Sequence, residues 1–214
     1  MELPFTAEQF GEVFRKYNTS VWPLQVIFYL LAAITIFFLF KQSGSSSKLI
    51  SGILGFFWIW MGVVYHLIFF AGINKAAYIF GILFIMQGIL FIHMGVFKNL
   101  LAFKVNREFR SLVGIGFSLF ALIVYPIVGF YQNHIYPSSP TFGLPCPTTI
   151  FTFGILLLTE KKISIRIVII PFIWSIIGFT ASFNLGMKED ISLLVTALIA
   201  AVLIPFRWKF QPIL

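Results

Sequence analysis

The sequence predicts an all-α membrane protein, a polytopic bundle of transmembrane helices with seven spans. Of its 214 residues, 59% are hydrophobic and only 10% are charged, whereas soluble domains carry about 25% charged residues. The apolar residues also gather in long runs, and a helix needs about 20 such residues to cross a bilayer. We therefore expect the lipid bilayer to be the partner of most of the protein's surface.

The first segment, 1–20, is polar, and we expect it to form an amphipathic helix at the membrane interface. Thr6 is followed three residues later by Gln9, which is the spacing of a capping box. Apolar side chains then fall mostly on one helical face: Phe5, Phe10, Val13, Phe14 and Tyr17. This pattern is typical of a helix that lies on the membrane surface. The alternative is a partly frayed polar tail.

Seven apolar runs follow, and together they predict one membrane domain over residues 21–214. The runs are Val21–Phe40, Leu49–Ile73, Ala76–Phe97, Leu112–Gln132, Thr141–Thr159, Ile167–Leu185 and Ile191–Phe206. The first linker, "KQSGSSSK", is short and flexible. No linker is long enough for a separate soluble domain, and the first run is too long for the core of a cleavable signal peptide.

The basic residues between the runs predict the orientation of the bundle. If the N-terminus lies outside, the outer segments carry four of them: Arg15, Lys16, Lys75 and Lys188. The inner segments carry eleven: Lys41, Lys48, Lys98, Lys104, Arg107, Arg110, Lys161, Lys162, Arg166, Arg207 and Lys209. Lys and Arg favour the cytoplasmic side, so we expect an N-outside, C-inside, multi-pass protein. The net charge of +8 then reflects this orientation, and no nucleic-acid partner is expected.

Four prolines precede the unbroken part of the fifth run: Pro137, Pro140, Pro145 and Pro147. Residues 111–159 hold 49 positions without a formal charge, and they must cross the membrane twice. The unbroken part of the fifth run, Thr148–Thr159, covers roughly half of the ~30 Å hydrocarbon core. We expect irregular chain to enter the membrane and a half-helix to begin below the outer surface. The alternative is an outer loop over 136–147, a short tilted helix and a Cys146 that packs as an apolar residue.

The start of this half-helix is the predicted binding site. Pro147 suits the first helical position, which makes Cys146 the cap and places Thr148 and Thr149 in the first turn. Free N–H groups at a helix start favour a polar or anionic solute, as in the broken helices of transporters. A thiol at this position is also a candidate nucleophile.

Further polar residues are candidates for the same site. His66 lies near the outward end of the second run, and Asn74 and His134 lie close to the same level. Gln87 is the strongly polar residue in the middle of the third run, where it either lines a path or joins helices. His66, His134 and Asp190 are weak candidates for a metal site, because a tetrahedral metal needs such ligands but no HxxxH spacing is present. No cofactor is expected.

Four stretches carry a resemblance to a known family: "LPFTAEQF", "YNTSVWPLQ", "WIWMGVVYHLIFFAGINKAAYIFG" and "PTFGLPCPTTIFTFG". In these stretches the chain resembles an uncharacterised bacterial family of small multi-span membrane proteins, a domain of unknown function. The resemblance covers nearly the whole chain and implies an integral protein of the bacterial inner membrane. It brings no activity, substrate or site residue.

The function expected from these observations is that of a small-solute permease or channel-like protein with an outward-facing polar site after Pro147. One alternative is a membrane-embedded enzyme that uses Cys146 as a nucleophile or the weak metal site. Another is a non-catalytic membrane scaffold. A permease needs a water-accessible path past Cys146, a thiol enzyme fails without that thiol, and a scaffold tolerates polar substitutions there.

Overall fold

Helices form nearly all of the regular structure in this computed structural model, which describes residues 4–209. Their bounds are α1 Ala7–Ser20, α2 Leu24–Lys41, α3 Ser46–Trp60, η1 Met61–Phe69, η2 Phe70–Gly72, α4 Ala77–Phe91, η3 Ile92–Phe97, α5 Phe109–Leu119, η4 Phe120–Val124, α6 Tyr125–Tyr131, α7 Pro145–Leu156, α8 Ile165–Leu185, η5 Lys188–Asp190 and α9 Ile191–Lys209. η1, η3 and η4 are π-helical, and η2 and η5 are 3₁₀ turns. Residues 1–3 of the predicted surface helix and residues 210–214 of the predicted membrane domain lie outside this range.

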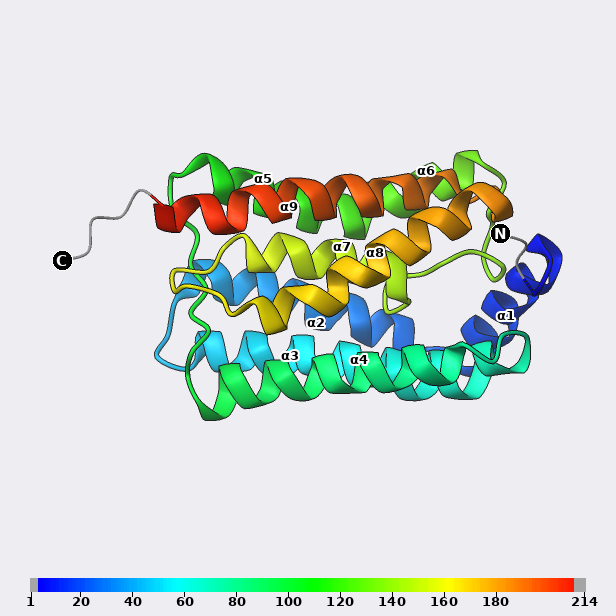
Figure 1. The fold of residues 1–214 in the computed structure, drawn as a ribbon, viewed down its shortest axis with the longest axis horizontal. Coiled ribbons are helices and arrows are strands. Elements are labelled where there is room, and N and C mark those ends of the chain that lie inside the picture. The colour runs from blue at the N-terminus through cyan, green and yellow to red at the C-terminus, as the bar shows by residue number, and fades with distance from the viewer. Residues whose placement is uncertain (1–3, 210–214) are drawn as a thin grey trace.

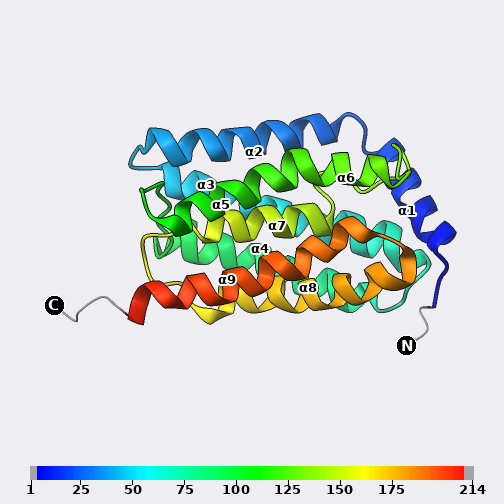
Figure 2. The ribbon, with the colours of Figure 1, turned by 90° about the horizontal axis from the view of Figure 1, so that it is seen from above.

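The long helices lie side by side along one axis, and the segments that join them alternate between the two ends of the bundle (Figures 1 and 2). α1 lies across one end, beside the joining segments 73–76, 132–144 and 186–190, and we call this the capped end. The opposite end holds 42–45 and 98–108 together with 157–164. We call it the basic end because these residues gather there: Lys41, Lys48, Lys98, Lys104, Arg107, Arg110, Lys161, Lys162 and Arg166.

Five helices among the described residues are long and apolar enough to cross a membrane: Leu24–Lys41, Ser46–Gly72, Ala77–Phe97, Phe109–Tyr131 and Ile165–Leu185. The helical fold class is confirmed, and the length and composition of these five helices are compatible with a membrane protein. α7, with 12 residues, is too short to span a bilayer alone. The count of seven spans and the N-outside orientation stay predictions.

The predicted N-terminal helix is present as α1, and its capping box is confirmed. The Thr6 backbone N–H donates to Gln9 Oε1 at 2.9 Å, and the Gln9 backbone N–H donates to Thr6 Oγ1 at 3.2 Å. Phe14 and Tyr17 on the apolar face of α1 are buried against Tyr65 of η1, and a position of the helix at the membrane interface stays a prediction. The amphipathic pattern therefore serves to attach the helix to the end of the bundle.

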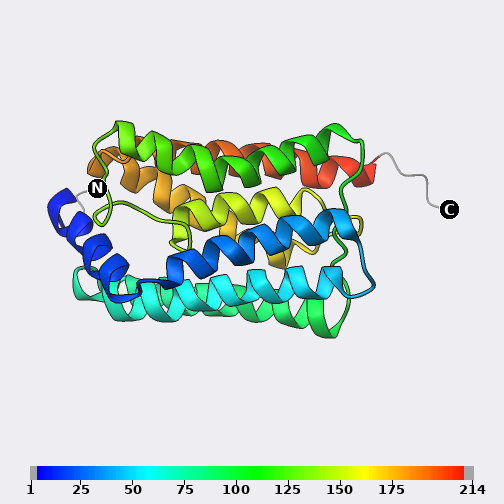
Figure 3. The ribbon, with the colours of Figure 1, turned by 180° about the vertical axis from the view of Figure 1, so that it is seen from behind.

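The chain between α6 and α7 enters the bundle as irregular backbone. α7 then begins partway along the length of the bundle (Figures 1 and 3). Asn18 of α1 holds this segment: its Nδ2 donates to the carbonyls of Pro137 (2.7 Å) and Ser139 (2.8 Å), and its Oδ1 accepts from Thr141 Oγ1 (2.8 Å). These bonds satisfy backbone groups that have no helical partner.

The first turn of α7 differs from the prediction. The helix begins at Pro145, with Leu144 as the residue before it, so Cys146 lies inside the first turn and is not the cap. Two prolines both fit here because the first N–H groups of a helix have no intrahelical partner to lose. α7 therefore begins two residues earlier than the prediction based on Pro147.

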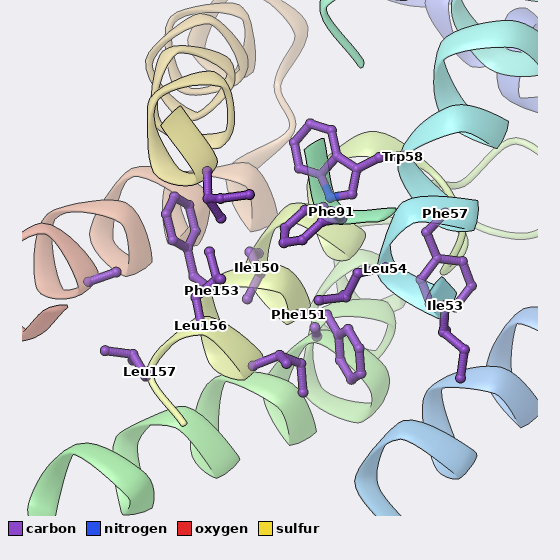
Figure 4. Packing of buried hydrophobic residues seen from close by; sticks show 14 of the residues in the cluster. Ile53, Leu54, Phe57, Trp58, Phe91, Ile150, Phe151, Phe153, Leu156 and Leu157 are labelled. Atoms are coloured by element: carbon purple, nitrogen blue, oxygen red, sulfur yellow. The ribbon is translucent and has the colours of Figure 1, made fainter. Parts of the chain in front are cut away.

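α7 is the central helix of the bundle, and its residues from Pro147 to Leu156 are all buried. Figure 4 shows its side chains packed among those of α3 and α4: Ile150, Phe151, Phe153, Leu54, Trp58 and Phe91. Its one polar link to α3 is a hydrogen bond from Trp58 Nε1 to Thr152 Oγ1 at 3.0 Å. A helix that is apolar on every side is a buried helix, which explains why this stretch carries no charge.

Candidate functional site

A cavity of about 470 Å³ lies under α1 at the capped end. Part of its wall comes from the N-terminal segment and α1: Phe5, Phe10 and Phe14. The rest of its aromatic wall comes from η1, η2, α4 and α8: Tyr65, Phe70, Phe80 and Trp174. The cavity reaches the start of α7, where Leu144, Pro145 and Cys146 line it.

The rings of the aromatic wall contact one another across elements in two groups. Phe70 packs edge-on against Phe5 and Phe10, with ring centroids 5.4 and 5.7 Å apart, and stacks on Tyr65 at 5.7 Å. Phe80 and Trp174 meet edge-on at 5.5 Å. Ring faces carry partial negative charge, so such a wall attracts cations.

The charged group of the cavity is the carboxyl of Asp190, which is only 5% exposed. It accepts a hydrogen bond from the Tyr125 hydroxyl, and the Cys146 thiol lies nearby on the cavity wall. Burial raises the pKa of Asp190 from 3.8 to about 7, and the nearby Glu189 adds to this rise, while the Tyr125 hydroxyl and the Cys146 thiol oppose it. Near neutral pH this carboxyl is therefore divided between its charged and uncharged forms.

The neighbouring Glu189 carboxyl contacts side chains of the protein itself. Its Oε1 lies 2.7 Å from His134 Nδ1, and its Oε2 accepts from Gln132 Nε2 at 3.2 Å. The Glu189 side chain is fully buried, and His134 is largely so. Among the described residues, no Lys, Arg or His forms an ion pair with Asp190. Of the two acids, Asp190 alone faces the cavity without a positive partner.

Trp174 Nε1 is a further polar atom of the cavity wall. It makes no hydrogen bond of ordinary geometry within the described residues, and it lies beside the Cys146 sulfur. Both atoms are close to the place where a side chain on Gly178 would begin, at 4.0 and 3.7 Å. The Leu193 side chain packs against Gly178 at the same point, 2.7 Å from that position, so Gly178 allows α8 and α9 to approach closely beside the indole N–H and the thiol.

His66 lies behind the aromatic wall and does not line the cavity. Its imidazole is fully buried, and neither ring nitrogen has a hydrogen-bond partner among the described residues. Aromatic rings surround it, with centroids 4.5 to 6.0 Å away: Tyr65, Phe70, Phe80, Phe84 and Trp174. It stands in π-helical η1, a type of segment that is frequent at functional sites.

The structure brings some of the predicted site residues together and separates others. Cys146 and Asn74 line the cavity. Thr148 does not line the cavity, and its Oγ1 accepts a hydrogen bond from the Gly143 N–H at 3.1 Å. The buried Thr149 hydroxyl has no hydrogen-bond partner among the described residues. Gln87 does not line the cavity: its Nε2 donates to the Ile167 carbonyl at 2.8 Å, so it joins α4 to α8.

Residues 4–209 contain no group of side chains that could hold the predicted metal ion. No three His, Cys, Asp or Glu side chains of that range are arranged to hold a metal ion. His66 is enclosed by rings, and His134 contacts Glu189.

A comparison with protein families shows where the chain belongs. Residues 7–212 match a family described as "Family of unknown function (DUF6064)". The comparison with curated proteins gives no match, and neither does the comparison with solved structures. The resemblance to an uncharacterised family is thereby confirmed.

Proposed function

Because the chain belongs to this family of unknown function, we propose a function from the cavity itself: the protein is a small-solute permease whose outward-facing site binds a small lipophilic organic cation. The observation that carries the proposal is the buried carboxyl of Asp190, which faces an aromatic cavity without a positive partner among the described residues.

A cation suits this cavity for two physical reasons. A buried carboxylate is costly unless a positive charge or hydrogen bonds compensate it, so a bound cation supplies what Asp190 lacks. Aromatic faces add about 0.5–2 kcal/mol of attraction for a desolvated cation. The anionic solute expected from the helix start is disfavoured here, because the Asp190 carboxyl lies close to Cys146 in the first turn of α7 and repels an anion.

The volume and wall of the cavity restrict the ligand to a small amphipathic molecule. Ligand pockets usually enclose about 300–1,000 Å³, and this one encloses about 470 Å³. Its polar groups gather near Cys146 and Asp190, whereas Phe5, Phe10 and Phe70 line it elsewhere. An alkyl- or arylammonium ion meets both requirements.

Transport is the role that the broken helix favours. Irregular backbone inside a membrane bundle is tolerated only where protein or a water-filled cavity surrounds it, and discontinuous helices of this kind form the substrate sites of transporters. The excess of Lys and Arg at the basic end favours a cytoplasmic position for that end. The capped end then faces outward across a bacterial inner membrane, and the packed side chains of α7 close the path on the inner side.

The proposal is tested by calorimetric titration of the purified protein with phenyltrimethylammonium, a permanent cation, and with its uncharged isostere tert-butylbenzene. We expect the cation to bind more tightly than the isostere and to lose about tenfold or more in affinity in Asp190→Asn. The matched control is Glu8→Gln, an exposed acid on α1 at the same end, which should bind as the wild type does. Equal binding of cation and isostere would refute the choice of ligand.

Uptake separates a permease from a receptor or scaffold. Proteoliposomes that contain the wild type should accumulate labelled phenyltrimethylammonium, and those with Asp190→Asn should not. Binding without uptake would contradict the permease and leave a binding protein. If Cys146→Ser abolishes uptake while cation binding stays intact, the result would instead favour an enzyme that uses the Cys146 thiol.

A further inference from the structure

The basic end carries a second apolar hollow, independent of the cavity under α1. It encloses about 620 Å³ between α8 and α9. Val168, Ile169 and Phe172 line it from α8, and Ala201 and Ile204 line it from α9. The small Ala201 side chain leaves the space open opposite these larger residues.

A smaller hollow of about 320 Å³ lies next to it, bounded by Met94 of η3 and by Leu100 and Leu101. Lys162 and Ile163, in the segment between α7 and α8, line both hollows. One exposed lysine, Lys162, thus borders both hollows, whose walls are mostly apolar.

The charges around Lys162 leave it available. The neighbouring Lys161 is committed to the protein, since its Nζ donates to the Asn99 carbonyl at 2.8 Å. The nearest acid in sequence, Glu160, faces Lys104 at 3.9 Å. Lys162 forms no ion pair with any acid of residues 4–209, and it is exposed. An exposed cation beside apolar grooves at a basic end is complementary to a lipid with an anionic headgroup.

We propose that this end of the protein retains one anionic two-chain phospholipid, with its phosphate on Lys162 and its acyl chains in the hollows on either side. This inference goes beyond the proposed transport function and does not depend on it. The acyl chains of a zwitterionic lipid would fill the hollows equally well, but its headgroup has no net charge to attract Lys162. The charge of the headgroup therefore distinguishes the two kinds of lipid. Each Lys or Arg near a membrane surface contributes enough attraction for about a fivefold preference.

The test measures lipid that stays bound through purification. Wild-type protein is extracted in mild detergent from vesicles of equal phosphatidylglycerol and phosphatidylcholine, and native mass spectrometry counts the retained lipids. We expect phosphatidylglycerol to be retained over phosphatidylcholine by about fivefold. Lys162→Gln should abolish this preference, whereas Lys41→Gln, at the same end on α2, should keep it.

A second variant tests the acyl-chain half of the site. Ala201→Leu fills the hollow between α8 and α9 and should lower total lipid retention, whereas Val202→Leu, at an exposed neighbouring position, should not. Circular dichroism melting shows whether each variant is folded. Retention without headgroup preference, or a preference that survives Lys162→Gln in folded protein, would overturn the proposal.

Discussion

Asp190 accepts a hydrogen bond from the Tyr125 hydroxyl, across the contact between η5 and α6. Tyr125 directly follows π-helical η4, and Asp190 directly precedes α9, so the bond ties the fourth long helix to the α8–α9 turn. The adjacent Glu189 is already held by His134 and Gln132. Glu189 is therefore paired within the protein, whereas Asp190 lines the cavity.

Binding of a cation should strengthen as the pH rises. Burial raises the pKa of Asp190 to about 7, so the carboxyl is about one-tenth ionised at pH 6 and about nine-tenths ionised at pH 8. Only the ionised form attracts a cation, and the charge of phenyltrimethylammonium does not change with pH. Its affinity should therefore rise about tenfold over this interval, as calorimetric titration at pH 6, 7 and 8 measures.

The control for this profile is Asp190→Asn, in which the affinity should stay flat with pH. The other titratable groups that face Asp190 remain in that variant: Tyr125 of α6, Cys146 of α7, Tyr65 of η1 and Glu189 with its partner His134. A pH dependence that persists in Asp190→Asn would assign the titration to one of them.

The same carboxyl predicts how the ligand-free protein responds to pH. Its pKa is higher in the folded protein, at about 7, than the ordinary value of 3.8, so the folded state binds the proton more tightly than the unfolded state. Stability from this group is therefore present below pH 4 and is lost as the pH rises towards 7. Thermal unfolding in detergent should show a smaller loss over this interval for Asp190→Asn than for the wild type.

Removal of the Tyr125 hydroxyl should change both binding and stability. Tyr125→Phe takes away a hydrogen bond that favours the charged form of Asp190, so the midpoint of the pH profile should move to higher pH. The loss of one buried bond should also cost about 1–2 kcal/mol of stability. Tyr131→Phe is the matched control, because Tyr131 is 81% exposed. An unchanged midpoint in Tyr125→Phe would show that the hydroxyl does not act on the carboxyl.

The sequence predicted those parts of the fold that depend on local pattern. The long apolar runs located the helices because their length matches a bilayer crossing, and Thr6 with Gln9 located the start of α1. The start of α7 was misplaced, since Pro145 and Pro147 are equally compatible with a first helical turn. The burial of α1 against Tyr65 depends on tertiary contact, which an amphipathic pattern does not distinguish from contact with lipid.

The candidate site was predicted only in part. Cys146 and Asn74 were identified because each is a polar residue at the level of the broken run. The aromatic wall was missed because its rings come from separate helices, and Trp174 in particular has the sequence context of a packing residue. Asp190 was considered as a metal ligand, since sequence alone does not reveal that His134 is bound to Glu189 instead.

Asn18 is predicted to hold the cover of the cavity in place. Its fully buried side chain connects α1 to Pro137, Ser139 and Thr141. Asn18→Ala leaves these groups unpaired and should cost about 2–3 kcal/mol, with weaker binding of phenyltrimethylammonium because α1 forms part of the wall. Melting temperature and titration measure the two effects. Asn184→Ala, which removes an exposed hydrogen bond on α8, should alter neither of them.

Gly143 is the position at which the irregular segment tolerates no side chain. Its φ of +99° is unfavourable for other residues, and a Cβ there would overlap the ring of Phe28. That ring cannot move aside easily, because it is buried against Phe57 and Trp60. Gly143→Ala should therefore cost about 3 kcal/mol or more and displace the start of α7, which chemical unfolding and cation titration would detect.

Two further variants separate the causes of this loss. Gly72→Ala, at the same end of the bundle, meets no atom within 4 Å and should unfold like the wild type. In Gly143→Ala combined with Phe28→Leu, relief of the overlap should recover part of the stability, while the strain of the positive φ should remain because it belongs to the backbone. If Gly143→Ala unfolds as the wild type does, the segment between α6 and α7 is not held against Phe28, and the position of Cys146 at the cavity loses its structural basis.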